Sequence, residues 1–173
     1  MKLSSVLSVI ICFTFSSVSA QETIKWVSFE KAVELAQTEP RPIIMDVYTD
    51  WCGWCKKMDA TTFANPKIAA YVNQYFYAVK FNAEQKEPIK FRDREYKFIA
   101  NGQRGYHELA AELLQGKLSY PTIVYLDKDI NLIQPIPGFQ TPQALEPIIN
   151  YFGSDKYRSM KWEDFSAQFI SNL

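Results

Sequence analysis

Two cysteines spaced three residues apart, Cys52 and Cys55, are the part of this sequence best suited to chemistry. They lie in residues 51–56, between an apolar run typical of a strand and a segment that can form a helix. At a helix start, this spacing places both side chains on one face, with their sulfurs within bonding reach. The helix dipole and the free N–H groups favour a thiolate at Cys52, which is the nucleophile in thiol–disulfide exchange. Cys55 would then resolve the mixed disulfide, and only the sulfur of Cys52 is expected to be exposed.

Other uses of the cysteine pair fit the sequence less well. Half of a zinc site needs two more ligands, yet the remaining cysteine is Cys12 and the single histidine is His107. We expect His107 at the surface or as a local hydrogen-bond partner. A purely structural disulfide would close a very short loop, which removes only about 2 kcal/mol of chain entropy. A pair without redox activity stays open as an alternative, but redox chemistry without a metal is the prediction.

The composition fits one globular domain. The chain has 173 residues, of which 47% are hydrophobic and 15% aromatic, enough for a sizeable core. Nineteen basic residues balance nineteen acidic ones, so neither a nucleic-acid partner nor a polybasic membrane patch is indicated. We find no internal repeat or linker that would mark a second domain.

The first twenty residues have the order of a signal peptide. Lys2 precedes an apolar run at residues 3–15, and small residues at 18–20 provide a cleavage site. The run is too short to span a bilayer comfortably, so no stable membrane insertion is expected. Bulky Ile11 precedes Cys12 where a lipoprotein signal has a small residue, so Cys12 should be lost with this segment. We therefore expect a signal peptide at 1–20, a single domain at 21–173, and export to an oxidising compartment, most simply a bacterial periplasm.

Apolar spacing predicts alternating helices and strands around the cysteine motif. Helices are expected at 28–38, from the motif to 63, from 65, at 106–114, from 141 and around 162–170, and strands at 43–48, 76–82, 122–126 and 130–136.

An unusual alternating stretch at residues 89–99 predicts an additional β-hairpin. A turn at 93–94 would pair Phe91 with Tyr96, and residues 101–105 would form a loop. One hypothesis is that this hairpin selects partners. Equally open is a purely structural role, because sheets need protected edges.

Motif and spacing together resemble the thioredoxin superfamily over residues 40–152. The most specific elements are the 51–56 motif and Tyr120-Pro121-Thr122, which is similar to the family's substrate-docking loop with a cis proline. The resemblance implies an α/β thioredoxin fold, with a central mixed sheet flanked by helices, here with an extra β-hairpin and extra terminal helices. It also implies a set of substrate-binding residues: Trp51, Gly53, Trp54, Tyr120, Pro121 and Thr122.

The resemblance further implies two groups that support proton transfer. Asp46 stands six residues before Cys52, where the family has a buried acid. Burial in an apolar strand should raise the pKa of this carboxyl, which suits it to accept the proton of Cys55. Lys80 matches the lysine that accompanies that acid, although the two could simply be a charged pair at a strand end. Trp54 stands where thioredoxins usually have proline, which leaves the reduction potential open.

These observations predict an exported thiol–disulfide oxidoreductase, an enzyme that acts on protein thiols and disulfides together with an unidentified redox partner. Reduction is preferred over oxidation, because nothing resembles the inserted helical domain of a dedicated oxidase. No metal, nucleotide or flavin cofactor is implied. The alternative is a chaperone-like, protein-binding module of the same fold in which the cysteines rarely turn over.

Overall fold

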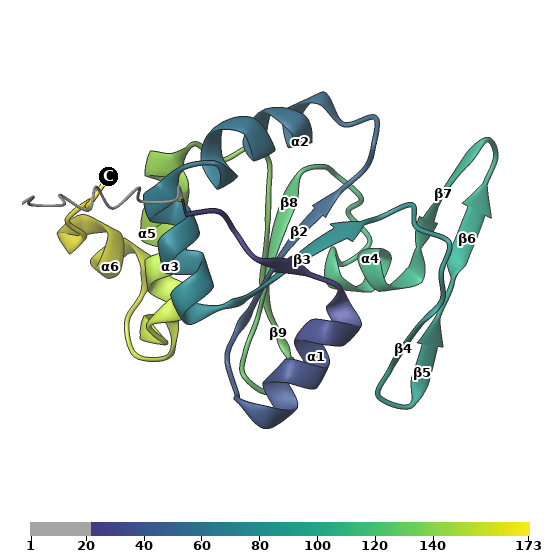
Figure 1. Ribbon diagram of the computed structural model, residues 1–173, viewed down its shortest axis with the longest axis horizontal. Helices are drawn as coiled ribbons and strands as arrows, with labels where there is room; N and C mark the ends of the chain where they lie inside the picture. The colour runs from purple at the N-terminus through teal and green to yellow at the C-terminus, as the bar shows by residue number, and fades with distance from the viewer. Residues whose placement is uncertain (1–21) are drawn as a thin grey trace, which may run out of the picture.

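A five-stranded mixed sheet forms the centre of the protein (Figure 1). The computed structural model describes residues 22–173, so the signal peptide predicted at 1–20 lies outside the described residues. The strand order is β1-β3-β2-β8-β9. Strands β1 (Trp26–Val27), β3 (Tyr77–Asn82) and β2 (Ile43–Tyr48) run parallel, whereas β8 (Thr122–Leu126) and β9 (Leu132–Pro137) continue the sheet antiparallel.

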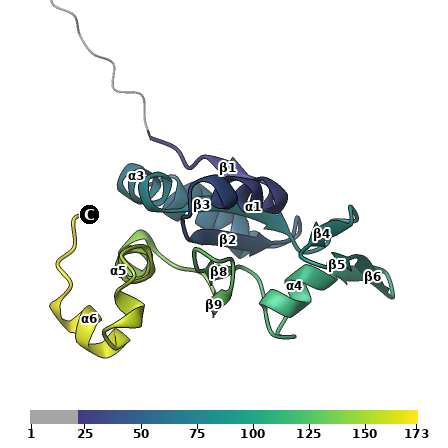
Figure 2. The same ribbon diagram turned by 90° about the horizontal axis from the view of Figure 1, so that it is seen from below.

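Helices cover both faces of the sheet and create two apolar cores. One core lies against α1 (Phe29–Thr38) and α4 (Glu108–Leu113). The other lies against α2 (Gly53–Met58), α3 (Pro66–Tyr75) and α5 (Pro142–Gly153), and α6 (Trp162–Gln168) packs beyond α5. In Figures 1 and 2, α5 and α6 lie at one end of the molecule and strands β4 to β7 at the other. None of the helices in residues 22–173 combines the length and apolar character that crossing a bilayer requires.

Strand β2 determines which face of the sheet the Asp46 side chain occupies, because alternate residues of a strand point to opposite faces. Ile43, Met45 and Val47 belong to the core beneath α1 and α4, and Ile44 belongs to the core beneath α2, α3 and α5. Asp46 shares the face of Ile44 by this alternation. Its carboxyl is therefore directed toward the layer that contains α2 and the cysteines.

Side-chain caps fix the helix starts that the sequence predicted. Ser28 Oγ accepts the Lys31 N–H at 3.2 Å at the start of α1. Asn65 precedes Pro66 and caps α3, and Thr141 caps α5 in the same way. Each cap satisfies N–H groups that a helix start leaves without a partner. The predicted starts at 28, 65 and 141 are confirmed.

The first hairpin exists, but the pairing predicted for it is wrong. Strands β4 (Ile89–Phe91) and β5 (Arg94–Tyr96) pair Ile89 with Tyr96, because the turn falls at 92–93. Arg92 adopts a positive φ of 55°, and its guanidinium donates to the carbonyls of Asp129 and Ile130 and to Asn131 Oδ1. These contacts tie the hairpin tip to the turn between β8 and β9, which accounts for the shifted turn.

A second hairpin replaces the loop expected at 101–105. Strands β6 (Phe98–Asn101) and β7 (Arg104–His107) pair across a two-residue turn in which Gly102 has a φ of 61°. Glycine adopts this backbone conformation without steric cost. At Gly105, an added Cβ would lie 2.2 Å from Phe98 Cζ, so the phenyl ring crosses the strand where no side chain stands. The glycines that indicated a loop therefore shape a hairpin.

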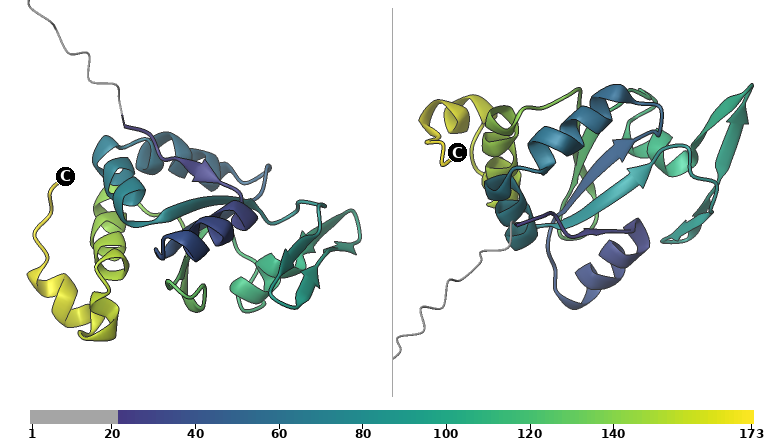
Figure 3. Two further views of the ribbon diagram at one scale, coloured as in Figure 1. Left: turned by 60° about the horizontal axis from the view of Figure 1, so that its bottom comes forward. Right: turned by 45° about the horizontal axis from the view of Figure 1, so that its top comes forward.

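His107 joins the second hairpin to α4. The residue is fully buried, so the surface position considered for it is wrong, whereas the local hydrogen-bonding role is correct. Its Nδ1 accepts the Leu109 N–H at 3.2 Å and caps α4, and its Nε2 lies 3.2 Å from the Glu87 carbonyl. The base of the hairpin is therefore anchored inside the protein, while the strands extend outward (Figure 3).

Candidate active site

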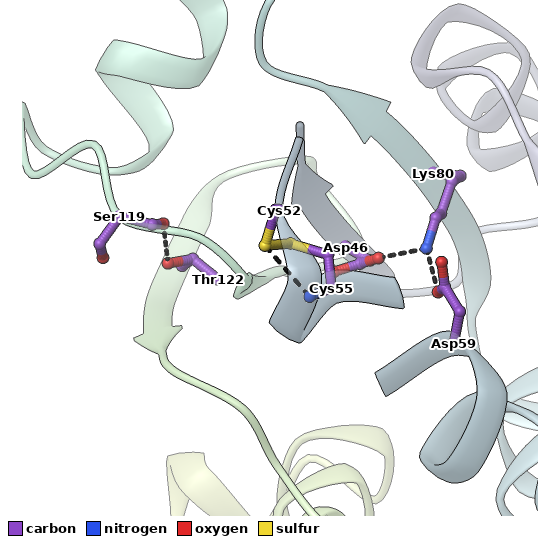
Figure 4. The surroundings of a disulfide bond; sticks show 7 residues. All are labelled: Asp46, Cys52, Cys55, Asp59, Lys80, Ser119 and Thr122. Atoms are coloured by element: carbon purple, nitrogen blue, oxygen red, sulfur yellow. Dashed lines mark hydrogen bonds and ion pairs between the residues drawn. A yellow bond between two sulfur atoms is a disulfide. The ribbon is translucent and has the colours of Figure 1, made fainter. Parts of the chain in front are cut away.

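The two cysteines meet at the start of α2, where they form a disulfide with an Sγ–Sγ distance of 2.10 Å (Figure 4). Cys52 is the N-cap of the helix, and its sulfur accepts the Cys55 N–H at 3.1 Å. The exposed fraction is 5% for Cys52 and 1% for Cys55. Cys52 is the more accessible of the two, as expected, but it is buried rather than exposed, because its sulfur turns inward to cap the helix and bond to Cys55.

Three charged groups form a linked cluster behind the disulfide. The Lys80 ammonium donates to Asp46 Oδ2 at 2.6 Å and also to the carboxylate of Asp59. Asp46 is fully buried on β2, whereas Lys80 on β3 is partly exposed. Figure 4 shows the Asp46 side chain between the disulfide and Lys80, with Asp59 bonded to the same ammonium. The sequence therefore paired Asp46 with Lys80 correctly, and the two face the cysteine layer.

Burial controls the protonation of Asp46. Desolvation raises the pKa of this carboxyl from its ordinary value of 3.8 to about 6, although Lys80 opposes the shift. Burial by itself lowers the pKa of Lys80, but Asp46 and Asp59 outweigh burial and raise it. Asp46 Oδ1 has no hydrogen-bond partner within residues 22–173. The carboxyl thus has one atom held by the ammonium and one atom free to receive a proton near neutral pH.

Asp59 is a site residue that the sequence reading missed. It begins a π-helical segment, η1 (Asp59–Phe63), which directly continues α2. Such segments are rare and occur often at functional sites. A clue was present in the sequence, because Asp59 follows Cys55 by four residues and so shares its helix face. The segment directs this carboxylate to Lys80, where it competes with Asp46 for the ammonium.

Two exposed indoles flank the cysteines. Trp51 and Trp54 are 51% and 58% exposed. The Trp51 ring meets Tyr120 edge-on at 6.0 Å between centroids, and its Nε1–H donates to Glu84 at 3.0 Å. The Trp54 ring lies 5.4 Å from the ring of Phe139. Gly53, between them, is also exposed and has open space where a Cβ would be, so the surface around the cysteine pair is apolar and accessible.

The loop before β8 closes the site on the other side. The Tyr120–Pro121 peptide bond is cis, which confirms the expectation for this loop. Thr122 donates its hydroxyl to the Ser119 carbonyl at 2.8 Å, and Gly138 donates its N–H to the Pro121 carbonyl at 2.8 Å. Because β8 pairs with β2, Thr122 lies opposite Val47, near the point where β2 leads to the cysteines. The structure therefore brings together the loop and the cysteine motif.

No three His, Cys, Asp or Glu side chains in the described part of the chain are grouped as a metal site would require. The chemistry available here is that of a dithiol and disulfide beside a buried acid.

The mixed sheet, its flanking helices and the cysteine pair at a helix start define a member of the thioredoxin superfamily with the site of a thiol–disulfide oxidoreductase. The Thioredox_DsbH family model, described as "Protein of unknown function, DUF255", matches residues 14–135. The chain belongs to this family.

Similar proteins of known structure share the fold. A structure described as DsbH oxidoreductase superposes with a TM-score of 0.56 at 17% identity, covering 86% of this chain and 95% of that one. A thioredoxin-fold protein from Helicobacter pylori gives a TM-score of 0.57 at 18% identity, covering 75% and 80% of the two chains. A thioredoxin from Thermus thermophilus gives 0.55 at 16% identity, covering 74% and 85%.

Curated relatives match over a shorter region. The thiol:disulfide interchange protein DsbD of Vibrio vulnificus is 35% identical over 46 residues, which is 27% of this chain and 8% of that protein. DsbD of Yersinia enterocolitica is 30% identical over 63 residues, which is 32% of this chain and 11% of that protein. The match therefore spans about a tenth of the length of these relatives.

Proposed function

We propose that this protein is an exported thiol–disulfide oxidoreductase that reduces disulfides in other exported proteins. The observation that carries the proposal is the Cys52–Cys55 disulfide at a helix start, beside the buried carboxyl of Asp46. The names of the curated relatives, thiol:disulfide interchange proteins, support exchange with protein partners. The apolar order of residues 1–20 supports export, with a single domain at 21–173.

The reaction begins from the dithiol form. The Cys52 thiolate attacks one sulfur of a partner disulfide, so that a mixed disulfide forms and the other partner sulfur leaves as a thiolate. Cys55 then attacks the Cys52 sulfur, releases the second partner thiolate, and leaves the Cys52–Cys55 disulfide. Two electrons pass to the partner, and protons convert its two thiolates to thiols. A second protein dithiol must then reduce the Cys52–Cys55 disulfide before another cycle.

Asp46 supports the second step. Cys55 must lose its proton before it can attack, and a buried carboxyl with a pKa of about 6 can accept that proton near neutral pH. Lys80 stabilises the carboxylate before the transfer, through its ion pair of 2.6 Å. The Pro121 loop and the Trp51 and Trp54 rings would form the surface that receives the partner chain.

Single cysteine variants test this proposal. Cys52→Ser should abolish disulfide exchange, whereas Cys55→Ser should accumulate mixed disulfides with exported partners because the resolving thiol is missing. Affinity capture followed by reduction and mass spectrometry identifies those partners, and the double variant is the control for non-covalent capture. If Cys55→Ser captures no more than the double variant, and the wild type reduces no protein disulfide, the oxidoreductase proposal is wrong. Capture that is equal in all variants would indicate the protein-binding module instead.

A further inference from the structure

Arg104 differs from the other arginines of the described chain. Arg41, Arg94 and Arg158 form ion pairs, and Arg92 donates hydrogen bonds to the turn after β8. Within residues 22–173, Arg104 does neither, and its guanidinium carbon lies 4.4 Å from the centre of the Trp51 ring instead. The N–H donors of Arg104 are therefore available to a partner, and they lie beside Trp51, which directly precedes Cys52 in the chain.

The second hairpin holds Arg104 in this position. Arg104 is the first residue of β7 and pairs with Asn101 across the turn. The base of the hairpin is fixed by buried His107, and Gly105 lets the Phe98 ring cross the strand next to Arg104. On its other side, the Trp51 ring is held by the hydrogen bond from Nε1 to Glu84. The contact between Arg104 and Trp51 is thus supported on one side by the hairpin and on the other by Glu84, in the turn after β3.

A second cation lies on the second exposed indole. Lys57 Nζ is 4.9 Å from the Trp54 ring centre and 5.4 Å from that of Phe139. Lys57, like Arg104, has no ion pair within residues 22–173. Cation–π contact holds such a group near an apolar surface while its charge remains unneutralised. We call Arg104, Lys57, Trp51 and Trp54 the cationic rim.

The nearby carboxylates do not neutralise this rim by direct pairing. Glu84 accepts the Trp51 indole N–H, and Asp50 accepts from Asn82 Nδ2 at 3.1 Å. Among residues 22–173, neither carboxylate forms an ion pair with Arg104 or Lys57. A carboxylate that a partner brings to either indole would therefore meet a cation with free donors, and the approaching partner would displace part of the water there.

We propose that the cationic rim recognises polypeptide partners that carry Asp or Glu close to the cysteine that exchanges with Cys52. The inference rests on the proposed disulfide exchange and adds the class of partner. The Arg104 guanidinium carbon lies 4.4 Å from the Trp51 ring centre, and the planar fork of N–H donors on this group suits two parallel hydrogen bonds to a carboxylate. Exclusion of water by the two indoles strengthens this interaction relative to an exposed ion pair.

The test compares two peptides, each with an internal disulfide, that are identical except for Asp or Asn beside the first cysteine. The full mature protein is reduced, mixed with each peptide, and quenched at intervals for chromatography. The rate constants are divided by those for reduction of the same peptide by dithiothreitol, which removes differences in intrinsic reactivity. We expect a corrected Asp-to-Asn rate ratio of about three to ten at low ionic strength, decreasing with salt.

Five variants, one of them a control, test whether the preference comes from the cationic rim. Arg104→Gln and Lys57→Gln should each lower the ratio, and the double variant should bring it to about one. Lys90→Gln is the matched control, because Lys90 is exposed on β4 and has no ion pair there. It removes the same charge and should keep the wild-type ratio. Arg104→Lys, which retains the charge without the planar fork, should give an intermediate ratio.

The outcomes separate this inference from the proposed function. A wild-type ratio near one, or a ratio that the double variant leaves unchanged, overturns the inference while exchange itself stands. Failure to reduce either peptide overturns the proposed function. In that case, calorimetry measures binding of the same peptides with Ser in place of both cysteines. Equal affinity for the Asp and Asn peptides overturns the inference. A preference for the Asp peptide that is lost in the double variant supports it.

Discussion

Burial of Asp46 makes the free energy of unfolding depend on pH. The folded protein holds its pKa at about 6, above the ordinary 3.8, so the folded state retains a proton that the unfolded chain releases more readily. The stabilisation from this bound proton is complete below about pH 4 and is lost as the pH rises through 6. At 1.36 kcal/mol per pKa unit, the loss is about 3 kcal/mol.

Asp46→Asn should therefore raise the free energy of unfolding by about 2–3 kcal/mol at pH 8 and change it little at pH 4. Urea unfolding at the two pH values, with the disulfide intact in both proteins, provides the measurement. Glu30→Gln, which alters an exposed acid on α1, is the control for the change in net charge. A gain that is equal at both pH values would show that the effect does not come from ionisation of Asp46.

Asp59 acts on the same carboxyl through Lys80. Its negative charge raises the pKa of Asp46 and occupies part of the shared ammonium. In Asp59→Asn, the Lys80 ammonium would pair with Asp46 alone and the nearby negative charge would be gone, so the pKa of Asp46 should fall. The pH midpoint for release of a mixed-disulfide partner by Cys55 should then move to lower pH, whereas Asp59→Glu, which retains the charge, should move it less. An unchanged midpoint in Asp59→Asn would leave this carboxylate without influence on the site.

At this scale, the sequence was informative where chemistry depends on spacing along the chain. Cys52 and Cys55 could be placed from their separation, and Asp46 and Lys80 from the family pattern. Asp59 was missed although it follows Cys55 by one helical turn, because its partner Lys80 lies 21 positions later on β3 and helical periodicity does not indicate that contact. His107 was also misplaced in part, because its capping role depends on the preceding residues forming a strand.

Among the elements, the hairpin of β6 and β7 reaches the surface beside the cysteine pair. The first hairpin packs against the body through buried Ile89 and Tyr96 and through the contacts of Arg92. The second hairpin instead carries Arg104 to Trp51. The partner-selecting role considered for residues 89–99 stays a hypothesis, and the contact of Arg104 with Trp51 extends that hypothesis to the neighbouring hairpin.

Gly105→Ala tests how strongly that hairpin depends on close packing. The added methyl would lie 2.2 Å from Phe98 Cζ and 2.4 Å from the Ile99 carbonyl oxygen, and the latter belongs to the backbone and moves only with the strand. We expect a local cost of about 1–3 kcal/mol, seen as faster amide hydrogen exchange in β6 and β7. Exchange in β2 and β8 provides the internal control and should not change. Equal exchange in β6 and β7 of both proteins would mean that the hairpin adjusts without cost.

The ends of helices and strands could be predicted from the sequence where they depend on residues within one turn. The caps at Ser28, Asn65 and Thr141 were predictable because the cap residue and its N–H partners lie within one turn. The register of the first hairpin was not, since its turn is set by a contact of Arg92 with residues about forty positions later. Periodicity along a segment contains no information about such a partner.

At the scale of the whole molecule, the proposed export decides whether the folded protein retains residues 1–20. The basic, apolar and small-residue order of residues 1–20 predicts cleavage before Gln21. Expression of the full sequence in a bacterium, followed by fractionation and intact mass measurement, should yield a periplasmic protein that begins at residue 21. A mass that retains residues 1–20 would contradict the export proposal, and a mass increased by lipid on Cys12 would replace it with an anchored protein.

The two indoles beside the disulfide also make the protein its own optical reporter. Trp51 and Trp54 adjoin the cysteine pair in sequence and are half exposed, whereas the Trp26 ring packs against Phe63 and the Trp162 ring against Tyr151. A disulfide accepts an electron from an excited indole and so quenches its emission, and a dithiol does so less. Reduction should therefore brighten the intrinsic fluorescence, and Trp51→Phe with Trp54→Phe should remove most of that change. The redox state could then be followed in real time without any attached dye.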